Sequence, residues 1–118
     1  MSDYHEPAQE LSEHARDLTR ALNSLKEEIE AVDWYNQRVD LTGNDELKEI
    51  LAHNRDEEIE HACMTLEWLR RNMDGWDEEL RTYLFTEGDI TESEEKKPSE
   101  TPERGNLSLE NLTEEKGE

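Results

Sequence analysis

The feature that most constrains this chain is an apolar stripe with the period of an α-helix, which runs through its first third. The members of the stripe recur at intervals of three, four or seven residues, the spacing of one helical face. They are Leu11, Leu18, Leu22, Leu25, Ile29, Val32 and Val39. Pro7 suits a first helical turn, because its missing N–H is not needed there. The stripe therefore predicts one long amphipathic helix from about Pro7 to Asp40.

The segment after this helix has the composition of a short connection. It contains Gly43, which is typical of a helix end, and then Asn44 and Asp45, either of which can cap a following helix. The sequence next predicts a second helix from about Glu46 to Met73. Gly75 separates it from a short third helix over 76–86. Long helices joined by a short loop lie antiparallel, so we expect an all-α fold: a two-helix hairpin followed by a short C-terminal helix.

Composition indicates that this hairpin does not act alone. Only 31% of the residues are hydrophobic, and the formal net charge is −20. Two helices enclose no interior, so we expect a second copy to cover the apolar stripe and complete a four-helix bundle. The acidity argues against nucleic acid as a partner. No apolar run suits a membrane span or a signal peptide, and the single cysteine, Cys63, suggests a reducing cytoplasm.

The composition changes near Glu87. Residues 1–86 hold all seven aromatic residues and most of the periodic apolar positions, so they form the predicted folded domain. Residues 87–118 are acidic, contain Pro98 and Pro102, and have few large aliphatic side chains. Such a segment buries too little apolar surface to offset its ordering entropy. The sequence therefore predicts a disordered acidic tail.

Polar residues interrupt the apolar seam of the second helix. Its successive seam positions are Leu47, Leu51, Asn54, Glu58, His61, Thr65 and Trp68. An ionised carboxylate that faces a helical core costs several kcal/mol unless it is paired or bound to a metal. Glu58 and His61, one turn apart on one face, therefore suggest a pair of metal ligands.

The first helix supplies a third donor at the same level. Glu28 borders the apolar stripe and precedes Gly43 by as many residues as Glu58 follows it. Di-iron sites in four-helix bundles use one Glu from each of two helices and one Glu-x-x-His from each of the other two. One hairpin thus offers half of such a site, and a two-fold axis would complete it. The oxygen and nitrogen donors suit iron or manganese.

Other interpretations of these residues remain open. Glu58 and His61 could lie on a solvated acidic face, as most charged residues in helices do. The chain could be a non-catalytic acidic helical module for oligomerisation and interaction with a partner. The same donors could also serve a manganese- or zinc-binding protein.

The chain resembles the encapsulated ferritins, ferritin-like iron-oxidising proteins packaged inside encapsulin shells. The resemblance covers about residues 25–88 and is carried by five stretches. These are Glu27–Tyr35, Ile50–Glu58, Glu60–Ala62, Met64–Asn72 and Leu80–Gly88, which read EEIEAVDWY, ILAHNRDEE, EHA, MTLEWLRRN and LRTYLFTEG.

The resemblance implies roles for particular residues. Glu28, Glu58 and His61 would bind iron as a di-iron centre between two subunits, and Tyr35 would lie beside it. An outer metal-attracting site would consist of Glu27 and Glu30, with a contribution from Trp34. The implied activity is that of a ferroxidase, which oxidises Fe(II) to Fe(III) with dioxygen.

The resemblance also implies an assembly and a location. Dimers would close into an annular decamer inside an encapsulin shell in the cytoplasm, and the shell would store the oxidised iron as mineral. A C-terminal loading peptide would bind the shell, and residues 107–112 are the candidate. They keep spaced apolar residues but carry Glu110 and Asn111 where the family has a small pair.

Overall fold

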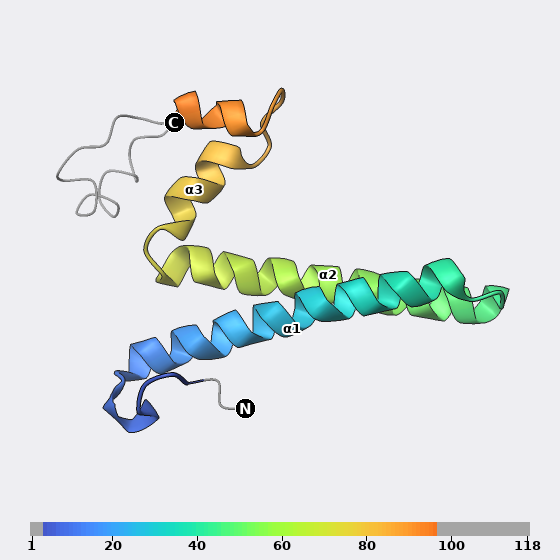
Figure 1. Ribbon diagram of the computed structural model, residues 1–118, viewed down its shortest axis with the longest axis horizontal. Coiled ribbons are helices and arrows are strands. Elements are labelled where there is room, and N and C mark those ends of the chain that lie inside the picture. Colours follow the sequence, from blue (N-terminus) through green and yellow to red (C-terminus); the bar gives the residue numbers. More distant parts are fainter. Residues whose placement is uncertain (1–3, 97–118) are drawn as a thin grey trace. The chain divides into compact units, whose positions relative to one another are not determined.

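The computed structural model describes residues 4–96, and all regular structure in that range is helical (Figure 1). The elements are η1 (Ala8–Glu10), α1 (Glu13–Leu41), α2 (Asp45–Asn72), α3 (Trp76–Tyr83) and η2 (Thr91–Lys96). The chain divides into two compact units, Met1–Leu69 and Arg70–Glu118. The all-α prediction is confirmed.

The first unit contains the predicted hairpin. In Figure 1, α1 and α2 run antiparallel and lie side by side from the short turn that joins them. The side chain of Asn44 accepts a hydrogen bond of 2.8 Å from the backbone N–H of Leu47, and so caps α2 as predicted. Thr42, in an extended conformation, ends α1. Gly43 follows this cap directly, close to where the sequence predicts the helix end. It does not adopt the left-handed conformation typical of a terminating glycine, because φ is positive only at Gly75 and Gly88 among the described glycines.

The first helix begins later than the apolar stripe predicts. Ser12 caps α1 by accepting a 3.0 Å hydrogen bond from the N–H of Ala15. Pro7 instead precedes the short 3₁₀ helix η1, and Leu11, the residue after η1, is extended. The prediction of one continuous helix from Pro7 is therefore wrong. The side-chain period continues through Leu11, whereas the backbone changes direction there.

The second unit, described by itself, holds the end of α2, then α3 and η2. Gly75, at φ 101°, forms the predicted break before α3. This helix ends at Tyr83 rather than Thr86, because Leu84 is extended and the hydroxyl of Thr86 donates a 2.9 Å hydrogen bond to the Tyr83 carbonyl. The 3₁₀ helix η2 lies beyond the predicted boundary at residue 87, and that boundary stays a prediction.

A carboxylate between two arginines links the end of α2 to α3. Asp77 accepts hydrogen bonds from Arg70 and from Arg81, the latter at 2.9 and 3.0 Å. Partial burial acts to raise the pKa of Asp77, but the hydrogen bonds from Arg81 and Arg70 outweigh it. They hold the pKa below its ordinary value of 3.8.

Burial within one chain is slight. Leu69 is the one fully buried apolar side chain among the described residues. Large apolar side chains stay exposed along both long helices: Leu22, Ile29 and Trp34 on α1, and Leu47, Ile50, Ile59, Met64 and Trp68 on α2. The isolated hairpin thus leaves much of its apolar surface uncovered, as the composition predicts.

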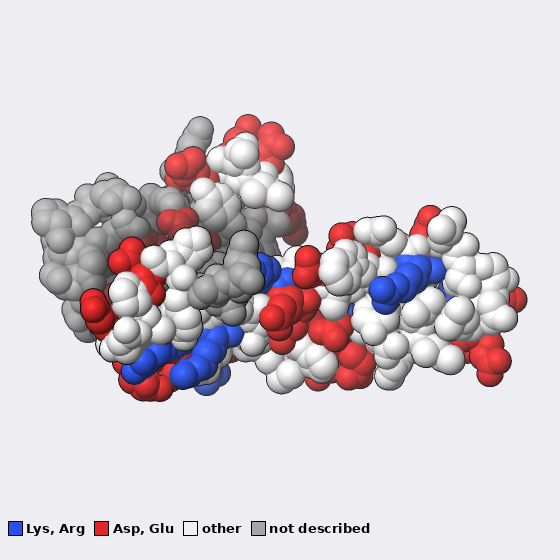
Figure 2. Space-filling model, turned by 60° about the horizontal axis from the view of Figure 1, so that its bottom comes forward, with Lys and Arg blue, Asp and Glu red and all other residues white. Residues whose placement is uncertain are grey.

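Charge and hydropathy complete this description. On the face that Figure 2 shows, acidic side chains are interspersed with uncharged ones, and basic side chains form a few small groups. Within residues 4–96, no helix combines the length and apolar character needed to cross a membrane. The candidate loading peptide at 107–112 lies outside the described residues.

Candidate metal centre

The Glu-x-x-His pair lies on α2 as the sequence predicts. Glu58 Oε1 is 3.5 Å from His61 Nδ1, so the two side chains face each other across one helical turn. Their side chains are 28% and 43% exposed in the single chain. The two potential ligands are thus adjacent, and both side chains remain partly exposed to solvent.

Glu28 on α1 is half-buried, and one of its oxygens has an unusual environment. Glu28 Oε1 is buried and receives no hydrogen bond from any residue that the structure describes. A buried carboxylate oxygen without a donor is destabilising by about 1–3 kcal/mol or more. This atom is therefore suited to a cation that the chain itself does not supply.

A hydrogen bond and a groove between α1 and α2 lie on either side of these donors along the hairpin. On the side of the turn, Arg55 Nη1 of α2 donates a 3.0 Å hydrogen bond to Asn36 Oδ1 of α1. On the other side, Ala21 of α1 and Thr65 of α2 line one groove. Along α1, Glu28 falls between Ala21 and Asn36. Along α2, Glu58 and His61 fall between Arg55 and Thr65, so the three candidate ligands belong to the same segment of the hairpin.

These donors do not close into a site within one chain. Among residues 4–96, no group of three or more His, Cys, Asp and Glu side chains is arranged to hold a metal ion. The structure therefore pairs Glu58 with His61 and leaves Glu28 outside that pair. The prediction that a second copy completes the site stays a prediction.

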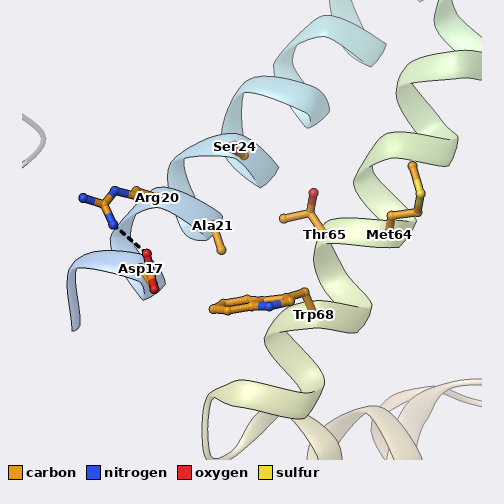
Figure 3. Close-up of a pocket in the computed structure, with 7 residues that line it drawn as sticks. All are labelled: Asp17, Arg20, Ala21, Ser24, Met64, Thr65 and Trp68. Atoms are coloured by element: carbon orange, nitrogen blue, oxygen red, sulfur yellow. Dashed lines mark hydrogen bonds and ion pairs between the residues drawn. The ribbon is translucent and has the colours of Figure 1, made fainter. Parts of the chain in front are cut away.

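A groove of about 370 Å³ lies between the two long helices. Its lining residues are farther from the inter-helical turn than the three candidate ligands are. Figure 3 shows Ala21 and Ser24 on α1, and the Trp68 indole reaching toward α1 from α2. Asp17 and Arg20 form a 2.6 Å ion pair at its edge. Apolar surface, including the 58% exposed Met64, is therefore open next to the candidate centre.

The residues assigned to an outer site lie on the exposed side of α1. Glu27 and Glu30 are exposed, and Trp34 is 50% exposed. Residues three apart are neighbours on a helix surface, so the two carboxylates can act together. Their side chains are exposed, whereas that of Glu28 is half-buried.

Tyr35 is half-buried and has a partner that the sequence analysis missed. The Arg38 guanidinium carbon lies 5.2 Å from the centre of the Tyr35 ring, which is a cation–π distance. The only signal in the sequence was their separation of three residues on one helix. Arg55 was missed as well, although the polar Asn36 within the apolar stripe pointed to a partner.

A second acidic contact to His61 was also missed. Glu57 Oε1 lies 3.9 Å from His61 Nε2, and Glu57 Oε2 lies 3.9 Å from His53 Nε2. The spacing of four residues between each pair was a visible signal. Cys63, two residues after His61, is exposed.

Several known proteins are similar to this chain. The chain is 68% identical to a "Ferritin-like protein" of Thermotoga maritima over 96 residues, which are 80% of this chain and 84% of that protein. It is 64% identical to an "Encapsulated ferritin-like protein" of Rhodospirillum rubrum over 74% of this chain and 62% of that one. An "Encapsulin nanocompartment cargo protein EncC" of Myxococcus xanthus is 36% identical over 47% of this chain and 43% of its own length.

A solved structure shares the fold at high identity. It is the crystal structure of protein ne0167 from Nitrosomonas europaea, with a TM-score of 0.73 and 60% identity, over 75% of this chain and 99% of that one. Residues 3–87 match the EncFtn-like family, and this range contains α1, α2 and α3. The chain therefore belongs to the EncFtn-like family.

Proposed function

We propose that this chain is a ferroxidase, which oxidises Fe(II) to Fe(III) with dioxygen at a di-iron centre between two copies. The observation that carries the proposal is the environment of Glu28, whose Oε1 is buried and receives no hydrogen bond. Glu58 and His61 supply an oxygen and a nitrogen in the same segment of the hairpin. Two relatives with the printed names of ferritin-like proteins support the assignment.

The donor set suits Fe(II) as a substrate. Carboxylate oxygens and imidazole nitrogen are ligands typical of iron in four-helix bundles. Two copies would contribute four carboxylates and two imidazoles, which is the full complement of such a site. Carboxylates also neutralise the growing positive charge as each ion loses an electron.

The other predicted residues have supporting roles in this proposal. Exposed Glu27 and Glu30 would collect Fe(II) at the surface, and Trp34 would border their site. Tyr35, half-buried beneath Arg38, would lie beside the centre. The role of each of these residues can be distinguished from that of an iron ligand by measuring iron binding and iron oxidation independently.

A purely structural acidic module is the competing interpretation. It accounts for the exposed apolar side chains, which would be covered by a partner. It gives no reason for a carboxylate oxygen to be buried without a donor. A manganese- or zinc-binding protein would use the same donors, and competition between these ions and Fe(II) measures the preference directly.

Iron oxidation by matched variants tests the proposal. We expect His61→Ala and Glu58→Gln to abolish the rise in Fe(III) absorbance and the uptake of dioxygen. The matched controls are His53→Ala and Glu60→Gln, which change exposed residues of the same helix outside the ligand set. Loss of oxidation in the controls, or its retention in the ligand variants, would contradict the ferroxidase assignment.

We further propose that the chain assembles as a decameric ring and is cargo of an encapsulin shell. A relative that is named as an encapsulin nanocompartment cargo protein supports the cargo assignment. The shell would be reached through residues 107–112, where spaced leucines suit an extended segment docked in a groove. Oxidised iron would then pass to the shell interior for storage.

Truncation tests the cargo assignment. A chain ending at Thr86 keeps α1, α2 and α3 but lacks the predicted tail. Co-purification with a co-expressed shell protein should be lost, whereas iron oxidation should persist. A variant with charged residues at Leu107, Leu109 and Leu112 should behave like the truncation, and undiminished binding would reject this segment as the signal.

A further inference from the structure

The carboxylate of Glu57 lies between two imidazoles on α2. One oxygen is 3.9 Å from His61 Nε2, and the other is 3.9 Å from His53 Nε2. Each pair is separated by four residues, so the three side chains follow one row along the helix. Nothing in the proposed ligand set assigns a role to Glu57.

This row is not arranged as a metal site of its own. Eight residues separate His53 from His61, which corresponds to about 12 Å along the helix axis. Side chains so far apart on one straight helix do not converge on one ion. In agreement, no three-membered metal-binding group occurs in the described part of the chain. Glu57 is therefore better understood through its effect on a neighbouring imidazole.

The two ring nitrogens of His61 face different carboxylates. Nδ1 lies 3.5 Å from Glu58 Oε1, whereas Nε2 lies 3.9 Å from Glu57 Oε1. A neutral imidazole has a lone pair on one nitrogen and a proton on the other. Because Glu58 belongs to the proposed ligand set, the nitrogen on its side is the one that would meet the metal.

We propose that Glu57 is a positioning residue, which accepts a hydrogen bond from His61 Nε2–H and thereby keeps the Nδ1 lone pair available for iron. This inference rests on the ferroxidase proposal. Histidine ligands characteristically donate their second N–H to a carboxylate, which fixes the tautomer and the orientation of the ring. The 3.9 Å separation is longer than a hydrogen bond, but such contacts often tighten only when the site is filled.

The second oxygen of Glu57 makes His53 a competitor. Glu57 is 49% exposed, and the His53 side chain is 71% exposed, so rotation toward either imidazole is sterically open. Removal of His53 should leave Glu57 to His61 alone. The inference thus predicts opposite consequences for removing the two partners of one carboxylate.

The tautomer of His61 in the metal-free protein provides a readout independent of activity. In ¹⁵N-histidine-labelled full-length protein, long-range ¹H–¹⁵N correlations measure how much of His61 is protonated at Nε2, which faces Glu57, and how much at Nδ1, which faces Glu58. The assignment uses the His61→Ala variant. Glu57→Ala should shift the tautomer equilibrium toward Nδ1–H, whereas the matched control Glu60→Ala should not. A His61 spectrum that is identical in Glu57→Ala and wild type would overturn the inference.

Metal affinity provides the second readout. With Co(II) as a spectroscopic probe, Glu57→Ala should bind roughly 10–100-fold more weakly than wild type, the usual effect of losing such a partner. Glu57→Gln keeps an acceptor oxygen and should recover part of this loss. His53→Ala should bind Co(II) at least as tightly as wild type. Weaker binding by His53→Ala, or wild-type affinity in Glu57→Ala, would contradict the role.

The two proposals fail in distinguishable ways. If wild type binds Co(II) through His61 but does not oxidise Fe(II), the ferroxidase assignment fails and the positioning role stands. If wild type oxidises Fe(II) and Glu57→Ala matches Glu60→Ala in tautomer and affinity, the positioning role fails alone.

Discussion

Among single residues, Glu28 has an environment that its neighbours on α1 do not share. Its Oε1 is buried and receives no hydrogen bond, whereas Glu27 and Glu30 on the same helix are exposed. In a protein without a ligand there, such an oxygen only reduces stability. Its position in the same segment of the hairpin as Glu58 and His61 agrees with the ligand role proposed for it.

Replacement of Glu28 should therefore raise the free energy of unfolding and abolish iron oxidation. Glu28→Met keeps the length of the side chain and removes the buried oxygen, so we expect the metal-free protein to unfold with a free energy about 1–3 kcal/mol higher. Iron oxidation should be lost at the same time. Chemical denaturation and oxygen uptake measure the two effects.

Glu27→Met is the control for this trade-off, because it removes an exposed carboxylate from the adjacent position. It should leave the free energy of unfolding within about 0.5 kcal/mol of wild type. A metal-free Glu28→Met protein that is less stable than the control would show that Glu28 contributes to folding rather than to metal binding.

Asp77 gives a pH dependence that belongs to the second unit. Its pKa lies below 3.8 in the folded chain because Arg81 and Arg70 donate hydrogen bonds that outweigh its partial burial. A lowered folded-state pKa adds stability above the unfolded pKa, and this stability is lost as the pH falls through the folded pKa. Asp77→Asn should thus cost about 1 kcal/mol at neutral pH and progressively less below pH about 4.

Thermal unfolding of wild type and Asp77→Asn from pH 7 to 3 measures this difference. Asp74→Asn is the control, since Asp74 is an exposed carboxylate three residues away. A gap between Asp77→Asn and wild type that stays constant over this range would show that charge at Asp77 is not its cause.

At the level of helices, the caps explain where the elements begin. Asn44 precedes α2, and its side chain receives the N–H of Leu47 at 2.8 Å. Asn44→Ala leaves this N–H without its partner and should lower the free energy of unfolding by about 1 kcal/mol. Asn44→Asp keeps an acceptor at the cap and should stay close to wild type. Equal destabilisation by both variants would contradict a capping role.

The sequence predicted the helices well and their ends less well. Apolar periodicity placed both long helices, and capping chemistry offered Asn44 or Asp45 as the cap of α2, of which the structure uses Asn44. Periodicity also carried the first helix through Leu11, where the backbone is extended. The reason is physical: periodicity records which side chains share a face, whereas Ser12 sets the start of α1 through a hydrogen bond to Ala15.

The candidate site was predictable to a similar degree. Ligand chemistry and spacing identified Glu58 and His61 as a pair on one face, which the structure places 3.5 Å apart. The contacts of Arg38 with Tyr35 and of Arg55 with Asn36 were not predicted. These contacts depend on the rotamers that long and flexible side chains adopt at the surface. Helical spacing does not specify those rotamers.

At the scale of the whole molecule, the main feature is the apolar surface that one chain leaves exposed. Leu69 is the one apolar side chain fully buried in residues 4–96, while several large ones on α1 and α2 stay exposed. Apolar area of this extent is typical of a surface that associates. A second copy would both complete the proposed ligand set and cover the exposed apolar side chains.

Association and iron oxidation should therefore fail together when the stripe is disrupted. Leu22, 37% exposed, belongs to the stripe, so Leu22→Asp removes about 1 kcal/mol of apolar burial at the dimer interface per copy. Two copies lose about 2 kcal/mol, which weakens dimerisation roughly 30-fold. Leu41→Asp changes an 86% exposed leucine at the end of α1, outside the stripe, and is the control. Sedimentation and oxygen uptake across a dilution series should show loss of both properties in Leu22→Asp alone. A monomeric protein that still oxidised Fe(II) at the wild-type rate would mean that one chain holds a complete site, against the shared centre proposed here.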